Sequence, residues 1–207
     1  MKVEKIVVGE LSENCHFLIE ENGECLIIDP GDEGEKIAEY ISENSLSLKG
    51  ILLTHGHFDH IMATHFLKEK YNCPVVMGEC DVEMIGNDEK NMGAYMGYHP
   101  KPFEVSKKVN DGDVVDISTF RINVIATPGH TKGSVCYLVE NFLFCGDTLF
   151  KNCVGRTDLY GGNSVVLMKS LEKLKNLNEN LITFSGHGES STIAQEKQNN
   201  PWLKSIV

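Results

Sequence analysis

The chain has 207 residues, of which 41% are hydrophobic, enough to build one well-packed core and too few for two full domains. We therefore expect a single domain over residues 1–207. The formal charge of −11 and the isoelectric point near 5.2 exclude the basic surface that phosphate-backbone binding requires, so nucleic acid is not an expected partner.

The sequence also limits the compartment. It contains no run of 18 apolar residues, and the apolar stretch near the N-terminus ends after three residues, so we expect neither a membrane span nor a signal peptide. Seven cysteines form an odd set without a CxxC pair, which is typical of reduced thiols. These features predict a cytoplasmic protein with no membrane partner.

The first half of the chain alternates between strand and helix patterns. A helix with apolar residues at helical spacing is expected at residues 34–43, and a second helix is expected after residue 60. The turn residues Glu21-Asn22-Gly23 predict a hairpin between two of the early strands. Strands are expected at residues 2–8, 15–20, 24–28, 50–53 and 74–77.

Residues 87–102 are rich in glycine and methionine and lack periodicity. Two interpretations stay open for this segment: a mobile flap over a site, or a surface loop.

The second half of the chain also combines strand patterns with helix patterns. Strands are expected at residues 114–117, 120–126, 134–139, 142–144 and 181–184, and helices at residues 165–177 and 192–199. Strand-rich halves that each end in helices predict an α/β fold, a four-layer αββα sandwich of two mixed β-sheets flanked by helices.

The motif THGHFDH at residues 54–60 follows one of these strands directly. His55 and His57 are two residues apart, so an extended backbone points both imidazoles to one side, where they can share a metal ion. Asp59 and His60 follow in a turn toward a helix and can reach a second, adjacent metal position.

Three further donors lie after other strands, each in a loop with glycine: His130, Asp147 and His187. Five histidines and two aspartates offer only nitrogen and oxygen, which suits zinc, iron or manganese. The remaining histidines are interpreted as ordinary core or surface residues; they are His16, His65 and His99.

The order of these motifs resembles the metallo-β-lactamase superfamily: THGHFDH at residues 54–60, TPGHT at 127–131, CGDTLF at 145–150 and SGHG at 185–188. Within the superfamily, GDTLF and the sequence VGRTD at 154–158 are most similar to glyoxalase II (hydroxyacylglutathione hydrolase) and its compact single-domain bacterial relatives. The resemblance covers nearly the whole chain.

The resemblance implies a role for each donor. It makes His55, His57 and His130 ligands of a first metal ion and Asp59, His60 and His187 ligands of a second, with Asp147 bridging the two. It further implies that Asp59 is catalytic and that Asp29 supports a ligand histidine from behind, although a plain turn aspartate is an equal interpretation.

The implied activity is hydrolysis of a small hydroxyacyl thioester, such as S-lactoylglutathione, by a hydroxide that bridges two divalent metal ions, most readily zinc. Arg156 is the candidate contact for an anionic substrate group, with a structural salt bridge as the alternative. The chain ends at Val207, so we expect no C-terminal helical domain for glutathione.

Other activities of the superfamily stay open. A persulfide dioxygenase would use one iron held by His55, His130 and Asp147, but Leu159 stands where those enzymes usually show an aromatic residue. A diiron oxidoreductase would generally carry glutamate in place of His57. β-Lactam hydrolysis and a non-catalytic binding role are further alternatives, and the complete donor set argues against the latter.

Overall fold

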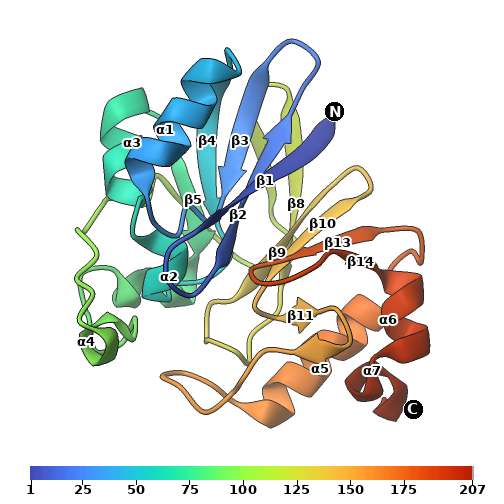
Figure 1. Cartoon of the computed structure of the whole chain (residues 1–207). Helices are drawn as coiled ribbons and strands as arrows, with labels where there is room; N and C mark the ends of the chain where they lie inside the picture. The colour runs from blue at the N-terminus through green and yellow to red at the C-terminus, as the bar shows by residue number, and fades with distance from the viewer. Residues whose placement is uncertain (207) are drawn as a thin grey trace.

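The computed structural model of the chain describes residues 1–206. Two six-stranded sheets pack face to face, and helices cover both outer faces (Figure 1). This arrangement confirms the predicted four-layer αββα sandwich.

The first sheet contains six strands in chain order, antiparallel for the first three and parallel from the third onward. The parallel pairing requires crossover connections, which the helices between the strands supply. The strands are β1 (Lys2–Val8), β2 (Glu13–Ile19), β3 (Glu24–Ile28), β4 (Ser47–Leu53), β5 (Val75–Gly78) and β6 (Lys107–Val109).

The second sheet is also mixed, because one pair of its strands is parallel and the others are antiparallel. In sheet order its strands are β14 (Ser191–Thr192), β13 (Ile182–Ser185), β10 (Phe142–Gly146), β9 (Val135–Val139), β8 (Phe120–Ala126) and β7 (Val114–Ile117). Strands β8, β10 and β13 therefore run in the same direction.

Helices α1 (Gly34–Glu43) and α3 (Thr64–Tyr71) cover the first sheet. Helices α5 (Ser164–Lys175), α6 (Ile193–Asn199) and α7 (Pro201–Ser205) cover the second. The remaining short elements are α2 (Phe58–Ile61), the 3-10 helix η1 (Glu79–Met84), α4 (Gly93–Met96) and the hairpin of β11 (Leu149–Phe150) and β12 (Cys153–Val154).

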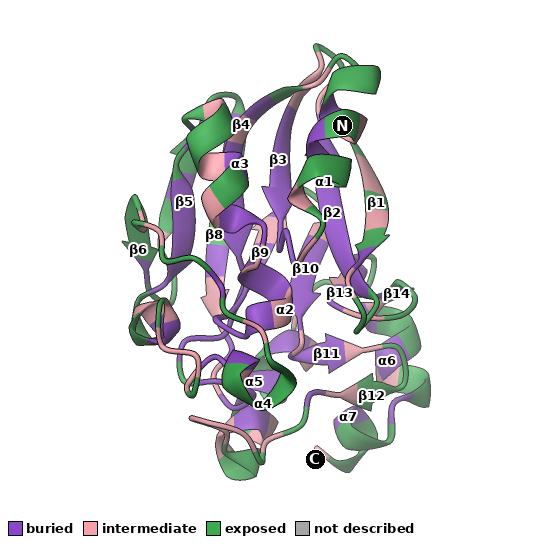
Figure 2. Ribbon diagram, turned by 60° about the vertical axis from the view of Figure 1, so that its left-hand side comes forward, coloured by how far each residue is buried: buried purple, intermediate pink, exposed green. Residues whose placement is uncertain are grey.

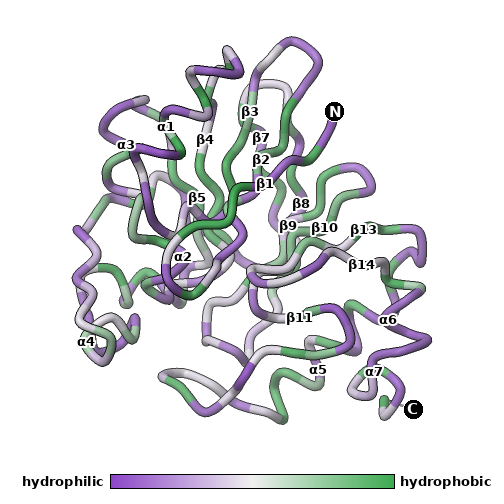
Figure 3. Tube along the Cα trace, viewed as in Figure 1, coloured by the Kyte–Doolittle hydropathy of each residue, from purple (hydrophilic) through white to green (hydrophobic). Residues whose placement is uncertain are grey.

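Side chains on alternate strand positions fill three separate apolar layers. In β2, Phe17 packs toward α1, whereas its neighbour Leu18 packs toward the second sheet. Strands buried on both faces in this way form the centre of the molecule (Figure 2), and the hydrophobic stretches of the trace follow them (Figure 3). The hydroxyl of buried Tyr137 in β9 donates to the carbonyl of Leu53 at 2.8 Å, joining the sheets where β4 ends.

Several boundaries differ from the sequence-based expectations. The single helix expected after residue 60 is two helices, α2 and α3, and β4 begins at Ser47 rather than at residue 50. Strand β6 and helix α7 were not expected. Within residues 87–102, the buried Asn91 accepts a hydrogen bond from the Phe58 amide at 2.9 Å through its carbonyl, so this segment is anchored against α2.

Within the described residues, none of the helices is both long enough and apolar enough to cross a membrane.

Candidate metal centre

The predicted donors gather where strands of both sheets end. His130 follows β8, Asp147 follows β10 and His187 follows β13, and these three strands point the same way. The motif at residues 54–60 follows β4 in the other sheet. Contacts among the side chains show that all seven donors meet at this one edge of the sandwich.

The first group, called here the histidine cluster, consists of His55, His57 and His130. One ring nitrogen from each lies within 4.8 Å of the others. His57 Nδ1 and His130 Nε2 face each other at 2.9 Å, and the His55 ring centre is 4.8 Å from the centres of both other rings. All three side chains are buried, so their nitrogens form a set of three potential ligands that is shielded from solvent.

The second group, the mixed cluster, consists of Asp59, His60 and His187. Asp59 Oδ2 lies 3.3 Å from His187 Nε2 and 3.7 Å from His60 Nε2. His60 is fully buried, whereas the side chains of Asp59 and His187 are 15% and 27% exposed. The mixed cluster is therefore the side of the centre that opens toward solvent.

Asp147 lies between the two clusters. Its Oδ1 is 3.4 Å from His60 Nε2, and its Oδ2 is 3.7 Å from His130 Nε2 and 3.8 Å from His187 Nε2. One carboxylate thus faces nitrogens of both clusters.

Unpaired buried atoms provide a test of whether metal ions fit these residues. His55 Nε2, His60 Nε2 and Asp147 Oδ1 are buried and have no hydrogen-bond partner within residues 1–206. Such atoms are costly to leave unpaired, and imidazole nitrogens with carboxylate oxygens are ligands that zinc, iron and manganese accept. The two clusters are consistent with a binuclear metal site.

Hydrogen bonds behind the rings orient the imidazoles. Asp29, held at a left-handed φ of 52°, accepts from the Thr54 amide at 2.7 Å, from the Thr54 hydroxyl at 2.5 Å and from His60 Nδ1 at 3.0 Å. His130 Nδ1 donates to the carbonyl of Arg156 at 2.7 Å, and His187 Nδ1 donates to that of Leu11 at 3.1 Å. Each bond leaves Nε2 facing the centre.

A third group of potential donors is Asp29, His55 and His60. Both oxygens of Asp29 are already engaged by Thr54 and His60, so this carboxylate supports the site from behind.

The pKa values of the donors differ across the centre. Asp147 and Asp59 raise the pKa of His60 well above its ordinary value against the effect of burial. Burial, together with the neighbouring imidazoles, lowers the pKa of His57 to about 3 and that of His55 well below its ordinary value, so both rings are neutral. Burial acts to raise the pKa of Asp147, but the neighbouring imidazoles, His60 foremost, together outweigh it, so the pKa falls and the carboxylate stays ionised.

Two glycines allow the loops to come this close. A Cβ at Gly186 would lie 2.4 Å from both Asp147 Oδ1 and His60 Cε1. A Cβ at Gly155 would lie 1.8 Å from the carbonyl oxygen of Asp147 and 3.2 Å from His130 Nδ1. Any side chain at either position would displace a donor.

The Arg156 side chain lies outside the centre. Its guanidinium forms two hydrogen bonds to Asp158, at 2.7 and 2.8 Å, and both side chains are more than 60% exposed. Only its main-chain carbonyl contacts a predicted donor. Two of the histidines that were set aside also lie elsewhere: His65 binds the Pro102 carbonyl and His99 binds Asp88.

The structure adds two buried acids that the sequence did not single out. Glu13 is 1% exposed, with Oε1 4.0 Å from His60 Nδ1, and burial raises its pKa well above the ordinary value. Asp81 is also 1% exposed and lies behind the histidine cluster. Neither belongs to a motif, so no local sequence signal marks them.

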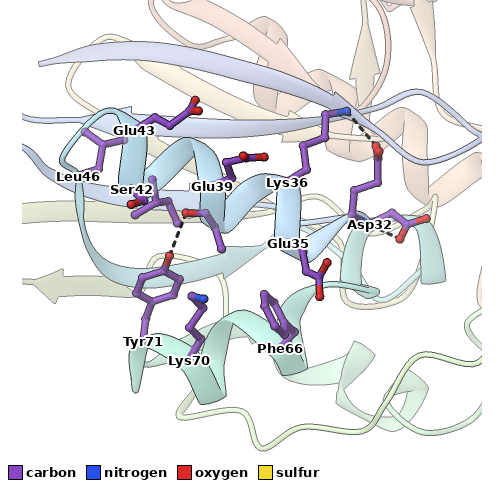
Figure 4. A pocket seen from close by; sticks show the side chains of 14 residues that line it. Asp32, Glu35, Lys36, Glu39, Ser42, Glu43, Leu46, Phe66, Lys70 and Tyr71 are labelled. Atoms are coloured by element: carbon purple, nitrogen blue, oxygen red, sulfur yellow. Dashed lines mark hydrogen bonds and ion pairs between the residues drawn. The ribbon is translucent and has the colours of Figure 1, made fainter.

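A wide depression on the outer surface lies between α1 and α3 (Figure 4). Charged side chains such as Glu35, Lys36 and Lys70 line it, and no member of either cluster does. It is therefore separate from the candidate centre.

The family model described as the metallo-beta-lactamase superfamily matches residues 8–187. The chain belongs to the metallo-β-lactamase superfamily. Among members of this superfamily, the chain is 39% identical to a protein of Bacillus subtilis named probable metallo-hydrolase YqgX, over 98% of both chains. It is 33% identical to the hydroxyacylglutathione hydrolase GloC of Haemophilus influenzae, over 99% of both.

Solved structures of the superfamily show the same architecture. The crystal structure of BLEG-1, called a B3 metallo-beta-lactamase, has a TM-score of 0.95 at 33% identity and covers 99% of this chain and 100% of its own. TTHA1623, solved in a di-iron-bound form, has a TM-score of 0.87 at 31% identity, with 97% of this chain and 100% of its own covered. Three of these four names or titles mention a metal, and the substrates that they mention differ.

Proposed function

We propose that the protein is a two-metal hydrolase that cleaves small hydroxyacyl thioesters, with S-lactoylglutathione as the representative substrate. The observation that carries this proposal is the position of Asp147 between two complete three-donor clusters. The names of the relatives from Bacillus subtilis and Haemophilus influenzae support hydrolysis, and the second supports a thioester.

In this proposal the histidine cluster would hold one ion and the mixed cluster the other, and Asp147, which faces both clusters, would serve both. Zinc is the metal we propose, because it accepts nitrogen and oxygen donors in a tetrahedral set and leaves a position open. Iron and manganese accept the same donors, and the di-iron form of TTHA1623 makes iron the main competitor.

Two metal ions, when bound, supply an acidified water as nucleophile and polarise the substrate carbonyl. The chain's own residues arrange this chemistry. Asp59 is partly exposed, and His60 and His187 together outweigh the effect of burial and lower its pKa, so the carboxylate is ionised. Its Oδ2 faces the mixed cluster, which leaves Oδ1 to accept a proton from the attacking water. Asp29 and the Leu11 carbonyl keep His60 and His187 oriented throughout.

A thioester needs no dedicated general acid in this scheme. A thiol has a pKa near ~8.5, so a thiolate departs without prior protonation, unlike an alcohol or amine. Cys145 cannot act as a protein nucleophile, because it is fully buried in β10 and its hydrogen bond with Cys136 and its burial raise the thiol pKa.

Arg156 is proposed to bind an anionic group of the substrate. Its ion pair with Asp158 is exposed, and exposed pairs contribute little to stability, so the guanidinium can exchange Asp158 for a substrate carboxylate at small cost.

The proposal is tested by replacing the shared carboxylate. Asp147→Ala should lower kcat for S-lactoylglutathione at least ~100-fold. Both clusters would lose a donor, and weaker metal binding would remove the stabilisation of the negative charge that develops on the substrate carbonyl. Asp116→Ala is the matched control, since Asp116 lies in an exposed pair with Arg121 on β7.

Wild-type kcat in Asp147→Ala would refute the two-metal mechanism. If the wild-type protein opens a chromogenic β-lactam but leaves the thioester intact, the two-metal mechanism would stand and the thioester substrate would be refuted.

A further inference from the structure

Asp81 is a charged residue in an unusual setting. It lies in η1, directly after β5, and its side chain is 1% exposed. A carboxylate is rarely buried to this degree unless hydrogen bonds compensate the loss of water.

Three donors from two separate loops surround this carboxylate. Oδ2 accepts from the Gly56 amide at 3.0 Å and from the Thr131 hydroxyl at 2.6 Å, and Oδ1 accepts from the Gly133 amide at 2.6 Å. Gly56 lies between His55 and His57, and Thr131 follows His130 in the chain. One side chain therefore joins the two loops that carry the histidine cluster.

The packing around Asp81 leaves little room for adjustment. A Cβ at Gly133 would lie 2.4 Å from the Asp81 amide nitrogen, and a Cβ at Gly78 would lie 2.0 Å from the Gly133 carbonyl oxygen. A Cβ at Gly56 would lie 2.9 Å from Met84, which is also in η1. The loops are thus seated against η1, and the carboxylate sets their separation.

We propose that Asp81 is a positioning residue for the metal site formed by the histidine cluster. It acts through the backbone at Gly56 and the hydroxyl of Thr131, and touches neither metal nor substrate. The mixed cluster receives its support elsewhere, from Asp29 and the Leu11 carbonyl. Loss of Asp81 therefore weakens one of the two metal sites selectively.

Asp81→Asn is the direct test, because asparagine has the same shape but one oxygen becomes an NH2 group. That group must face the amide of either Gly56 or Gly133, so a donor meets a donor and the loops move apart. Supports of this kind typically change metal affinity ~10- to 100-fold. We expect the variant to bind one metal ion with wild-type affinity and the other ~10- to 100-fold more weakly.

A matched control separates this effect from a general loss of stability. Glu196 is another fully buried acid with three donors, accepting from the Ser191 hydroxyl at 2.5 Å, the Asn152 amide at 2.9 Å and the Asn200 side chain at 2.8 Å. None of these partners is a donor of either cluster. Glu196→Gln should lower the unfolding temperature while both metal affinities stay at wild-type values.

The experiment titrates the metal-free full chain with cobalt(II) and with zinc against a chelator. Cobalt(II) absorption reports the coordination at each site, so Asp81→Asn should lose or shift the band of one site only. Equal weakening of both sites, the same weakening in Glu196→Gln, or wild-type affinities and spectrum in Asp81→Asn would each overturn the proposal.

Thr131 provides a second route if Asp81→Asn does not fold. Thr131→Val removes one hydrogen bond to Asp81 and keeps those from the Gly56 and Gly133 amides, so we expect a smaller weakening of metal binding at the same site. Thr131→Ser keeps the hydroxyl and should bind metal with wild-type affinity. Wild-type affinity in Thr131→Val would count against the proposal.

This inference rests on the two-metal centre of the proposed function, but its readout is metal binding and not turnover. If the wild-type chain binds no metal pair, the proposed function fails. If the wild-type chain binds two ions and Asp81→Asn binds both with wild-type affinity, only the proposed role of Asp81 fails.

Discussion

Gly186 is the position where one added methyl group tests the geometry of the centre most sharply. In Gly186→Ala the new Cβ would lie 2.4 Å from both Asp147 Oδ1 and His60 Cε1. The residue cannot retreat, because its carbonyl accepts from the Asn14 amide at 2.7 Å and its amide donates to the Gly146 carbonyl at 2.9 Å.

The size of the effect follows from these distances. Ordinary contacts to a Cβ begin at 3.4 Å, so Asp147 or His60 must move by about 1 Å. A displacement of that size at a reacting centre costs roughly 100-fold in rate, or about 2.7 kcal/mol of transition-state stabilisation. We therefore expect kcat/KM for the thioester to fall ~100-fold in Gly186→Ala.

The assay compares kcat/KM and metal content with those of Gly34→Ala. A Cβ at Gly34 meets the Phe66 ring at 2.7 Å, but Phe66 is 36% exposed, so its ring can turn away. Phe66 lines the outer depression, which no member of either cluster lines. The control should keep wild-type turnover. Wild-type kcat/KM and metal content in Gly186→Ala would refute the geometry described above.

Two further predictions concern the surroundings of the centre. Burial lowers the pKa of His16 from 6.5 to about 4, so between these pH values the unfolded chain takes up a proton that the folded chain does not. The free energy of unfolding should therefore fall by about 3 kcal/mol more in the wild type than in His16→Gln as pH drops from 6.5 to about 4; equal slopes in urea titrations would contradict this. Arg156→Ala should raise KM about tenfold with kcat unchanged, whereas an unchanged KM would leave Arg156 only its ion pair with Asp158.

The sequence predicted the architecture because the hydrophobic patterns of its strands and helices are local. Alternating apolar residues in β8, and helical spacing in α1 and α5, are each visible within about ten residues. The boundaries were less accurate. Ser47 to Lys49 extend β4 through pairing with β3, a tertiary contact that has no local pattern.

For the centre, the sequence predicted which donors belong together and missed most of their supports. His55 and His57 stand in a dense motif, and His130, Asp147 and His187 each follow a strand. Asp81, in contrast, binds Gly56 and Gly133, which are 25 and 52 residues away. An isolated acid whose partners are backbone amides of distant loops leaves no signature in a single sequence.

The number of metal ions bound by active protein tests the central claim most directly. The two clusters predict two transition-metal ions per chain by elemental analysis, with thioester hydrolysis that a chelator abolishes and added metal restores. A protein that is fully active with one iron, and that consumes oxygen on a glutathione persulfide, would contradict the two-metal hydrolase.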